Sequence, residues 1–68
     1  MTEKQERFID EYIIDFNATR AAIAAGYSSK RANSQGVHLL SIPEIQAEVR
    51  RRKAEISAGL RISAERVL

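Results

Sequence analysis

Apolar residues recur with the period of an α-helix over the first quarter of the chain. They follow the i, i+1, i+4, i+5, i+8 spacing of one helical face and are Phe8, Ile9, Tyr12, Ile13 and Phe16. Such a stripe is the core-facing surface of a helix, and other elements must cover it. No segment of the chain alternates between apolar and polar residues as a half-buried strand does. The pattern therefore predicts an all-α fold.

The size of the chain narrows the function classes. With 68 residues and no cysteine, a packed set of helices is the available source of stability. His38 is the single histidine, no carboxylate cluster surrounds it, and no phosphate-binding loop or nucleophile–base pair is present. We therefore expect no cofactor, no metal and no enzymatic activity. Without a run of about 20 apolar residues or a secretory signal, we expect an intracellular protein that does not enter a membrane.

Capping signals place the first two helices. Thr2 and Gln5 have the spacing of a capping box, which predicts that the first helix begins directly after Thr2. Asn17 is a good N-cap for an alanine-rich helix over residues 18–25. Gly26 follows as a residue that readily takes the left-handed conformation at a helix end.

A third helix is expected soon after that glycine. Ser28 can cap a helix over Ser29–Leu40, which leaves a turn of three residues after the second helix. The inner face of this third helix is expected to consist of Ala32, Gly36, Val37 and Leu40. Two short helices joined by a tight glycine turn are typical of a helix-turn-helix, and Ala22, one turn before Gly26, supplies the small contact.

The rest of the chain predicts a fourth helix and the start of another. Pro43 suits a first helical position, and the fourth helix is expected over residues 43–57, with Ile45, Val49 and Ile56 facing inward. Ala58–Gly59 should end it, and Ser63 should cap a further helix. We thus expect a small bundle of about four helices containing a helix-turn-helix over residues 1–59, and the truncated start of a following helical segment over 60–68. The residues expected to share one core are Phe8, Tyr12, Ile13, Ile23, Tyr27, Val37, Leu40 and Val49.

Charge is distributed unevenly along the chain. Residues 2–16 carry an excess of acids, whereas residues 17–42 contain Arg20, Lys30 and Arg31 and no Asp or Glu. An acid-free stretch suits a surface that lies against a polyanion. The outer face of the third helix is rich in groups that contact phosphates and base edges. With Arg20 from the preceding helix, the candidate DNA-binding residues are Ser29, Lys30, Arg31, Asn33, Ser34, Gln35 and His38.

A second basic run, residues 50–53, has a different interpretation. Four consecutive helical residues point around the whole cylinder, so they cannot all contact one surface. A solvated face, paired partly with Glu48 and Glu55, explains this run better than a nucleic-acid contact.

Two runs of the sequence resemble a known family. Residues 2–12 (TEKQERFIDEY) and 17–28 (NATRAAIAAGYS) are similar to the opening of phage terminase small subunits, and Pro43-Glu44-Ile45-Gln46 also looks like that family. The resemblance implies a DNA-binding domain that recognises double-stranded viral DNA for packaging in the host cytoplasm. It also implies a large-subunit partner that carries the ATPase and nuclease, and a ring-shaped homo-oligomer of the full-length protein. In that family residues 60–68 would be the truncated start of the oligomerisation segment. We expect the 68-residue chain alone to be monomeric.

Two other functions use the same features. A helix-turn-helix transcriptional regulator would bind a cellular operator, and a helical protein-interaction module would present the charged face to an acidic partner. DNA binding that weakens steeply with salt is expected of a terminase small subunit and of a transcriptional regulator, but not of a protein-interaction module.

Overall fold

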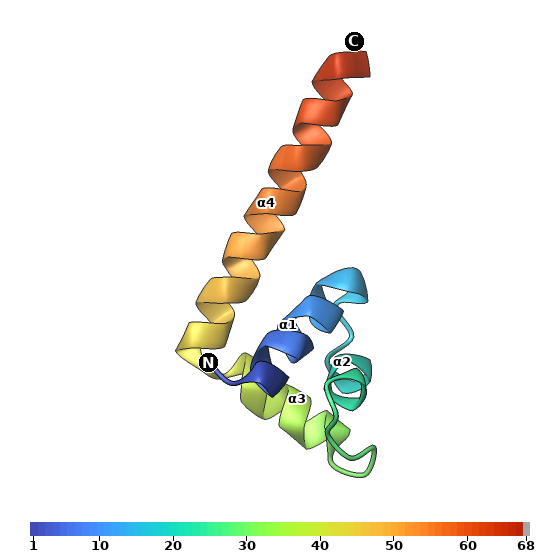
Figure 1. Ribbon diagram of the computed structural model, residues 1–68, viewed down its shortest axis with the longest axis vertical. Coiled ribbons are helices and arrows are strands. Elements are labelled where there is room, and N and C mark those ends of the chain that lie inside the picture. Colours follow the sequence, from blue (N-terminus) through green and yellow to red (C-terminus); the bar gives the residue numbers. More distant parts are fainter. Residues whose placement is uncertain (68) are drawn as a thin grey trace.

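The computed structural model describes the backbone of residues 1–67 and the side chains of residues 1–57. This part of the chain folds into four helices, α1 (Glu3–Asp15), α2 (Ala18–Ala24), α3 (Ala32–Leu40) and α4 (Pro43–Val67). The helices α1, α2 and α3 gather into a cluster, and α4 packs against it near its start and then projects as a long rod (Figure 1). The predicted all-α bundle of four helices is confirmed.

The caps expected at the first two helices are present. The Thr2 hydroxyl accepts a hydrogen bond from the Gln5 backbone N–H, and the Gln5 side chain accepts one from the Thr2 N–H, both at 3.1 Å. The Asn17 side chain accepts from the Arg20 backbone N–H at 3.0 Å. These bonds satisfy N–H groups that a helix start leaves without a partner, so they fix where α1 and α2 begin.

The end of α2 is a complete Schellman motif centred on Gly26. The Gly26 N–H donates to the carbonyl of Ile23, and the Tyr27 N–H donates to the carbonyl of Ala22, both at 3.0 Å. Gly26 has a φ of +106°, where a side chain is strained. The left-handed conformation predicted for this glycine is confirmed.

Gly26→Val is therefore expected to destabilise the fold by about 1–2 kcal/mol through backbone strain. A Cβ at this position would lie 3.6 Å from the Lys4 side chain, an ordinary contact, so steric crowding is not the cause. Urea unfolding of the variant measures the loss. Gly26→Asn is the matched control and should lose less, because asparagine tolerates positive φ. Equal stability of Gly26→Val and the parent protein would contradict the positive φ of Gly26.

The connection between α2 and α3 is longer than predicted. Helix α3 begins at Ala32, not at Ser29, and its N-cap is Arg31, which makes no side-chain capping bond. Residues 28–31 instead form a turn in which the Arg31 N–H donates to the Ser28 carbonyl at 3.1 Å. Because this turn separates Ser28 from the helix, the serine does not cap it. Seven residues, 25–31, join the two helices.

Alanines make up nearly half of the buried core. Its buried members are Phe8, Ile9, Ala21, Ala22, Ala25, Ala32, Leu39, Ile45 and Val49. The partly buried residues packed against them are Tyr12, Ile13, Ala18, Tyr27, Leu40 and Ile42. Four alanines in nine buried positions mean that the backbones of α2 and α3 approach their neighbours closely. Among residues 1–57, the large side chains that are fully buried are Phe8, Ile9 and Ile45.

Two residues predicted for the core are exposed, and in each case that prediction is wrong. Ile23 is exposed because α2 turns its alanines, including Ala21 and Ala22, toward the other helices. Val37 is exposed because α3 buries Ala32, Gly36 and Leu39 instead. Those three positions share a face that excludes residue 37.

Phe16 and Ile56 were also expected to face inward, and both are exposed. Phe16 ends α1 in the left-handed region, with φ 57° and ψ 30°, so its side chain leaves the stripe that the helix defines. Ile56 belongs to the part of α4 that lies beside the end of α1. The two side chains border a groove whose lining residues are Ile13, Ile14, Phe16, Lys53, Ile56 and Ser57.

Helix α4 continues through the predicted stop. It runs unbroken from Pro43 to Val67, so the expected end at Ala58–Gly59 and the new start at Ser63 are both wrong. A glycine inside a helix costs only about 1 kcal/mol, and no proline follows to prevent continuation. The predicted division at residues 59 and 60 falls inside this helix. Among the described residues, no helix is long and apolar enough to cross a membrane.

Candidate nucleic-acid interface

The position of α3 is set by a close contact with the start of α2. A Cβ atom placed on Gly36 would lie 2.9 Å from the carbonyl oxygen of Ala18 and 3.0 Å from its Cβ. The Thr19 hydroxyl also donates to the Asn33 side-chain oxygen at 3.4 Å. Glycine at position 36 therefore allows the two backbones to meet, and the pairing of α2 with α3 is consistent with a helix-turn-helix.

This packing leaves one surface of α3 open. The exposed residues that recur along this surface, termed the outer face, are Asn33, Ser34, Val37, His38 and Ser41. Gln35 is half-buried, so it lies toward the edge. The outer face therefore contains three of the seven candidate residues between positions 29 and 38, namely Asn33, Ser34 and His38, together with an unexpected valine.

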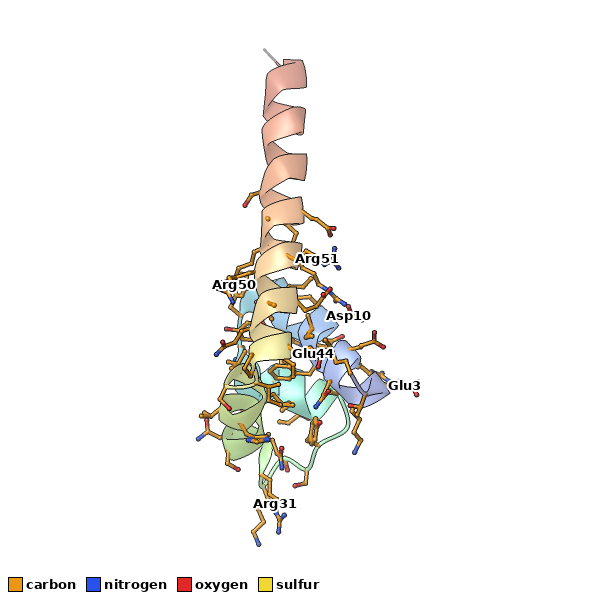
Figure 2. The ribbon with its side chains drawn as sticks, turned by 90° about the vertical axis from the view of Figure 1, so that its left-hand side faces the viewer. Glu3, Asp10, Arg31, Glu44, Arg50 and Arg51 are labelled. Carbon is orange, nitrogen blue, oxygen red and sulfur yellow. The ribbon has the colours of Figure 1, made fainter. Side chains whose placement is uncertain are left out.

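Three further candidate DNA-binding residues lie immediately before α3. Ser29, Lys30 and Arg31 are exposed in the connecting turn and are termed the tip. Arg31 points away from the protein at the end opposite the projecting part of α4 (Figure 2). Because the tip leads directly into the outer face, its two cations are continuous with the polar groups of α3.

Local hydrogen bonds order the beginning of the outer face. The Ser34 hydroxyl donates to the Arg31 carbonyl at 3.0 Å, and the Gln35 N–H donates to the same carbonyl at 2.8 Å. Arg31 is thereby held at the first turn of α3 through its backbone. Arg31 is exposed, so its guanidinium can contact an anion.

The structure places Arg20 in a different setting from the tip. Its guanidinium donates to Asp15 through Nε at 2.8 Å, to the Glu11 carboxylate at 2.9 Å and to the Glu11 carbonyl at 2.6 Å. The hydrogen bond from Arg20 is the main reason that the pKa of Asp15 is lowered. Arg20 thus links α1 to α2, and these bonds favour a structural role for it over the DNA contact expected from the sequence.

The basic run at residues 50–53 is paired much as predicted. Arg51 forms ion pairs with Glu48 and Glu55, and Arg52 pairs with Glu48 and with Asp10 of α1. Hydrogen bonds from Arg51 and then Arg52 lower the pKa of Glu48 to about 2. Figure 2 shows Arg50 and Arg51 on α4, well away from Arg31. This run is therefore separate from the tip.

Sequence analysis missed two residues near the interface. Lys4 of α1 lies over the Tyr27 ring, with its Nζ 5.0 Å from the ring centre, beside the turn that leads to the tip. No sequence signal indicated this contact between α1 and the turn. Val37 could have been placed outside by choosing Leu39 instead of Leu40 as the third inward position. The spacing of Ala32, Gly36 and Leu39 fits one helical face.

Comparisons with known proteins show the family to which this chain belongs. Residues 1–68 match the family model described as terminase small subunit, and the chain belongs to that family. It is 48% identical over 69 residues to the terminase small subunit of Bacillus phage SF6, an alignment that covers 100% of this chain and 48% of that protein. Identity is 44% to the terminase small subunit of Bacillus phage SPP1, over 98% of this chain and 46% of the relative.

A third relative is a prophage protein. The PBSX phage terminase small subunit of Bacillus subtilis (strain 168) is 41% identical over 100% of this chain and 26% of its own length. The chain therefore spans about half the length of the phage relatives that it matches, or less.

Proposed function

We propose that this chain is the DNA-binding region of a terminase small subunit and that it binds double-stranded viral DNA through the tip and the outer face of α3. Lys30 and Arg31 contact phosphates, and the outer face enters the major groove, which is wide enough to admit an α-helix. The region is non-catalytic and acts in the host cytoplasm with a large subunit that supplies the enzymatic steps.

One observation carries this proposal. The two exposed cations of the tip continue into a helix face whose residues include no acid, and residues 17–42 contain none anywhere. By contrast, the cations Arg20, Arg51 and Arg52 form ion pairs within the protein. The tip is thus a basic surface next to donor-rich side chains. Cations suit contacts to DNA phosphates, and hydrogen-bonding side chains suit contacts to base edges, so the two occur together in DNA-binding surfaces.

Few phosphate contacts imply weak binding by a single copy. A tip with two cations and a handful of polar neighbours should bind duplex DNA in the range of about 10⁻⁴–10⁻⁶ M near physiological salt. Useful affinity then comes from linking several copies, because each further contact forms at a high effective concentration. We propose that the full-length protein supplies this linkage as a homo-oligomeric ring, with residues 60–68 at the start of the assembling segment, and that the 68-residue chain alone is monomeric.

Substitution of Lys30 and Arg31 together by alanine should flatten the salt dependence of DNA binding. Each phosphate contact contributes about 0.9 to the slope of log affinity against log salt concentration, so losing two lowers its magnitude by up to about two units. Fluorescence anisotropy of a labelled duplex, titrated with the 68-residue chain at several salt concentrations, measures the slope.

The matched control removes two charges elsewhere. Arg7 and Arg50 are exposed on α1 and α4, and their replacement by alanine should change the slope by much less. Lys4 lies over Tyr27 beside the turn, so its replacement would also disturb the neighbourhood of the tip. An unchanged slope in the Lys30/Arg31 variant, or a larger change in the Arg7/Arg50 variant, would move the DNA-binding surface away from the tip. Salt-independent or absent DNA binding would instead favour a protein-interaction module.

A further inference from the structure

Val37 is an apolar residue in the middle of an otherwise polar surface. Its exposed fraction is 64%, although the residues immediately before it and two places after it, Gly36 and Leu39, are buried. Asn33 lies one turn before Val37 on the outer face and Ser41 one turn after it. A single exposed valine is ordinary on a protein surface, so its neighbours, and not its exposure, indicate a role.

The neighbours of Val37 are hydrogen-bonding groups. Ser34 and His38 are exposed beside it, and the cations of the tip lie at the start of the same helix. If these groups face the major groove, as proposed above, Val37 lies among the base edges and not among the phosphates. Its side chain offers no donor or acceptor there, and it can only make an apolar contact.

The major groove presents one exposed methyl group, the 5-methyl of thymine. The other groups along the base edges are hydrogen-bond donors and acceptors, which lose their water without gaining a partner if a valine covers them. Valine is also held to one main χ1 rotamer in a helix, so ordering its side chain against a base costs little entropy.

We propose that Val37 contacts the 5-methyl group of thymine and thereby selects DNA sites that carry thymine at that position. This inference rests on the proposed DNA-binding function and adds a specificity-determining residue to it. The tip supplies affinity for any duplex, whereas Val37 discriminates between base pairs. Burial of one methyl group corresponds to about a fourfold change in affinity.

The test compares thymine with uracil, which pairs identically but lacks the methyl group. A duplex enriched from a random-sequence pool on the immobilised 68-residue chain is prepared in two forms, with thymine or with uracil at every thymine position. The wild-type protein should bind the uracil form about fourfold more weakly. Val37→Ala should reduce this ratio to below about twofold, and Val37→Ile should preserve it. Competition anisotropy measures all the dissociation constants at one salt concentration.

Ile56→Ala provides the matched control. Ile56 is also an exposed β-branched residue, but it lies on α4 in the groove beside Phe16, away from the outer face. This variant should retain the wild-type ratio. Because Val37 is exposed, Val37→Ala leaves the core intact, and unchanged circular dichroism checks this.

The outcomes separate the two proposals. Equal binding of both duplex forms by the wild-type protein, or an undiminished ratio in Val37→Ala, overturns the role of Val37. If binding still depends on salt and on Lys30 and Arg31 in that case, the DNA-binding function stands. Absence of salt-dependent binding to either duplex overturns both.

Discussion

Phe8→Ala is expected to unfold this protein at or near room temperature. Phe8 is fully buried and stacks on Tyr12, with ring centres 5.7 Å apart. Truncation of a buried phenylalanine typically costs about 3–5 kcal/mol, and domains of this size have a total stability of about 3–10 kcal/mol. Four of the other eight buried core residues are alanines, whose short side chains cannot extend into the space that the ring leaves. Thermal and urea unfolding followed by circular dichroism measure the effect.

The second phenylalanine of the chain is a natural control. Phe16 is 48% exposed and packs at the edge of the groove, where the Lys53 ammonium lies 4.7 Å from its ring centre. Phe16→Ala removes the same atoms but should leave the protein folded, with a loss well below that of Phe8→Ala. If both variants melt like the parent protein, Phe8 is not part of the core.

Gly36→Ala is expected to destabilise the protein by about 1–2 kcal/mol, although alanine is the better helix former. The added methyl group would lie 2.9 Å from the carbonyl oxygen of Ala18 and 3.1 Å from its carbonyl carbon. Overpacking of this kind costs about 1–3 kcal/mol, and the gain in helix propensity of up to about 1 kcal/mol offsets only part of it. Urea unfolding gives the change in stability.

A double variant tests the cause of that loss. Ala18→Gly removes the Ala18 Cβ, which is one of the three atoms near the new methyl group, while the carbonyl remains. The combination of Gly36→Ala with Ala18→Gly should therefore show a favourable coupling but an incomplete recovery. Purely additive effects, or a Gly36→Ala variant more stable than the parent protein, would show that α2 and α3 are not in close contact here.

Local sequence signals predicted the parts of the fold that depend on hydrogen bonds between near neighbours. The Thr2 capping box, the Asn17 cap and the left-handed Gly26 each involve atoms within five residues, so side-chain type and spacing were sufficient. The helix start predicted after Ser28 and the helix end predicted at Gly59 also rested on local signals, but both predictions were wrong. A serine and a glycine permit a helix boundary without requiring one, because the backbone can satisfy its hydrogen bonds in other ways.

The direction in which side chains point was harder to predict. Helix α2 has seven residues and α3 has nine, so each offers only about two turns of pattern. In a helix as short as α3, a rotation about the axis that buries Val37 and Leu40 and a rotation that buries Leu39 both place apolar residues inside. In the structure, α3 is rotated so that Gly36 contacts Ala18, and these two residues are distant in the sequence. No local pattern contains that information.

The same limit applies to the candidate interface. The acid-free stretch and the donor-rich helix were visible in the sequence, and they identified the tip and most of the outer face. The ion pairs of Arg20 with Glu11 and Asp15 depend on how α1 and α2 cross. The sequence therefore grouped Arg20 with Lys30 and Arg31 by charge alone, although the structure gives it different neighbours.

The contact between Gly36 and Ala18 has a consequence for how such a protein can change over evolutionary time. Three buried residues of α3, Ala32, Gly36 and Leu39, hold the helix in place, and the outer face contributes nothing to the core. Mutations at positions 34, 37, 38 and 41 can therefore accumulate with little effect on folding, whereas the inner positions tolerate few alternatives. The exposed surface of α3 can thus diverge between related proteins while the scaffold of the domain stays unchanged.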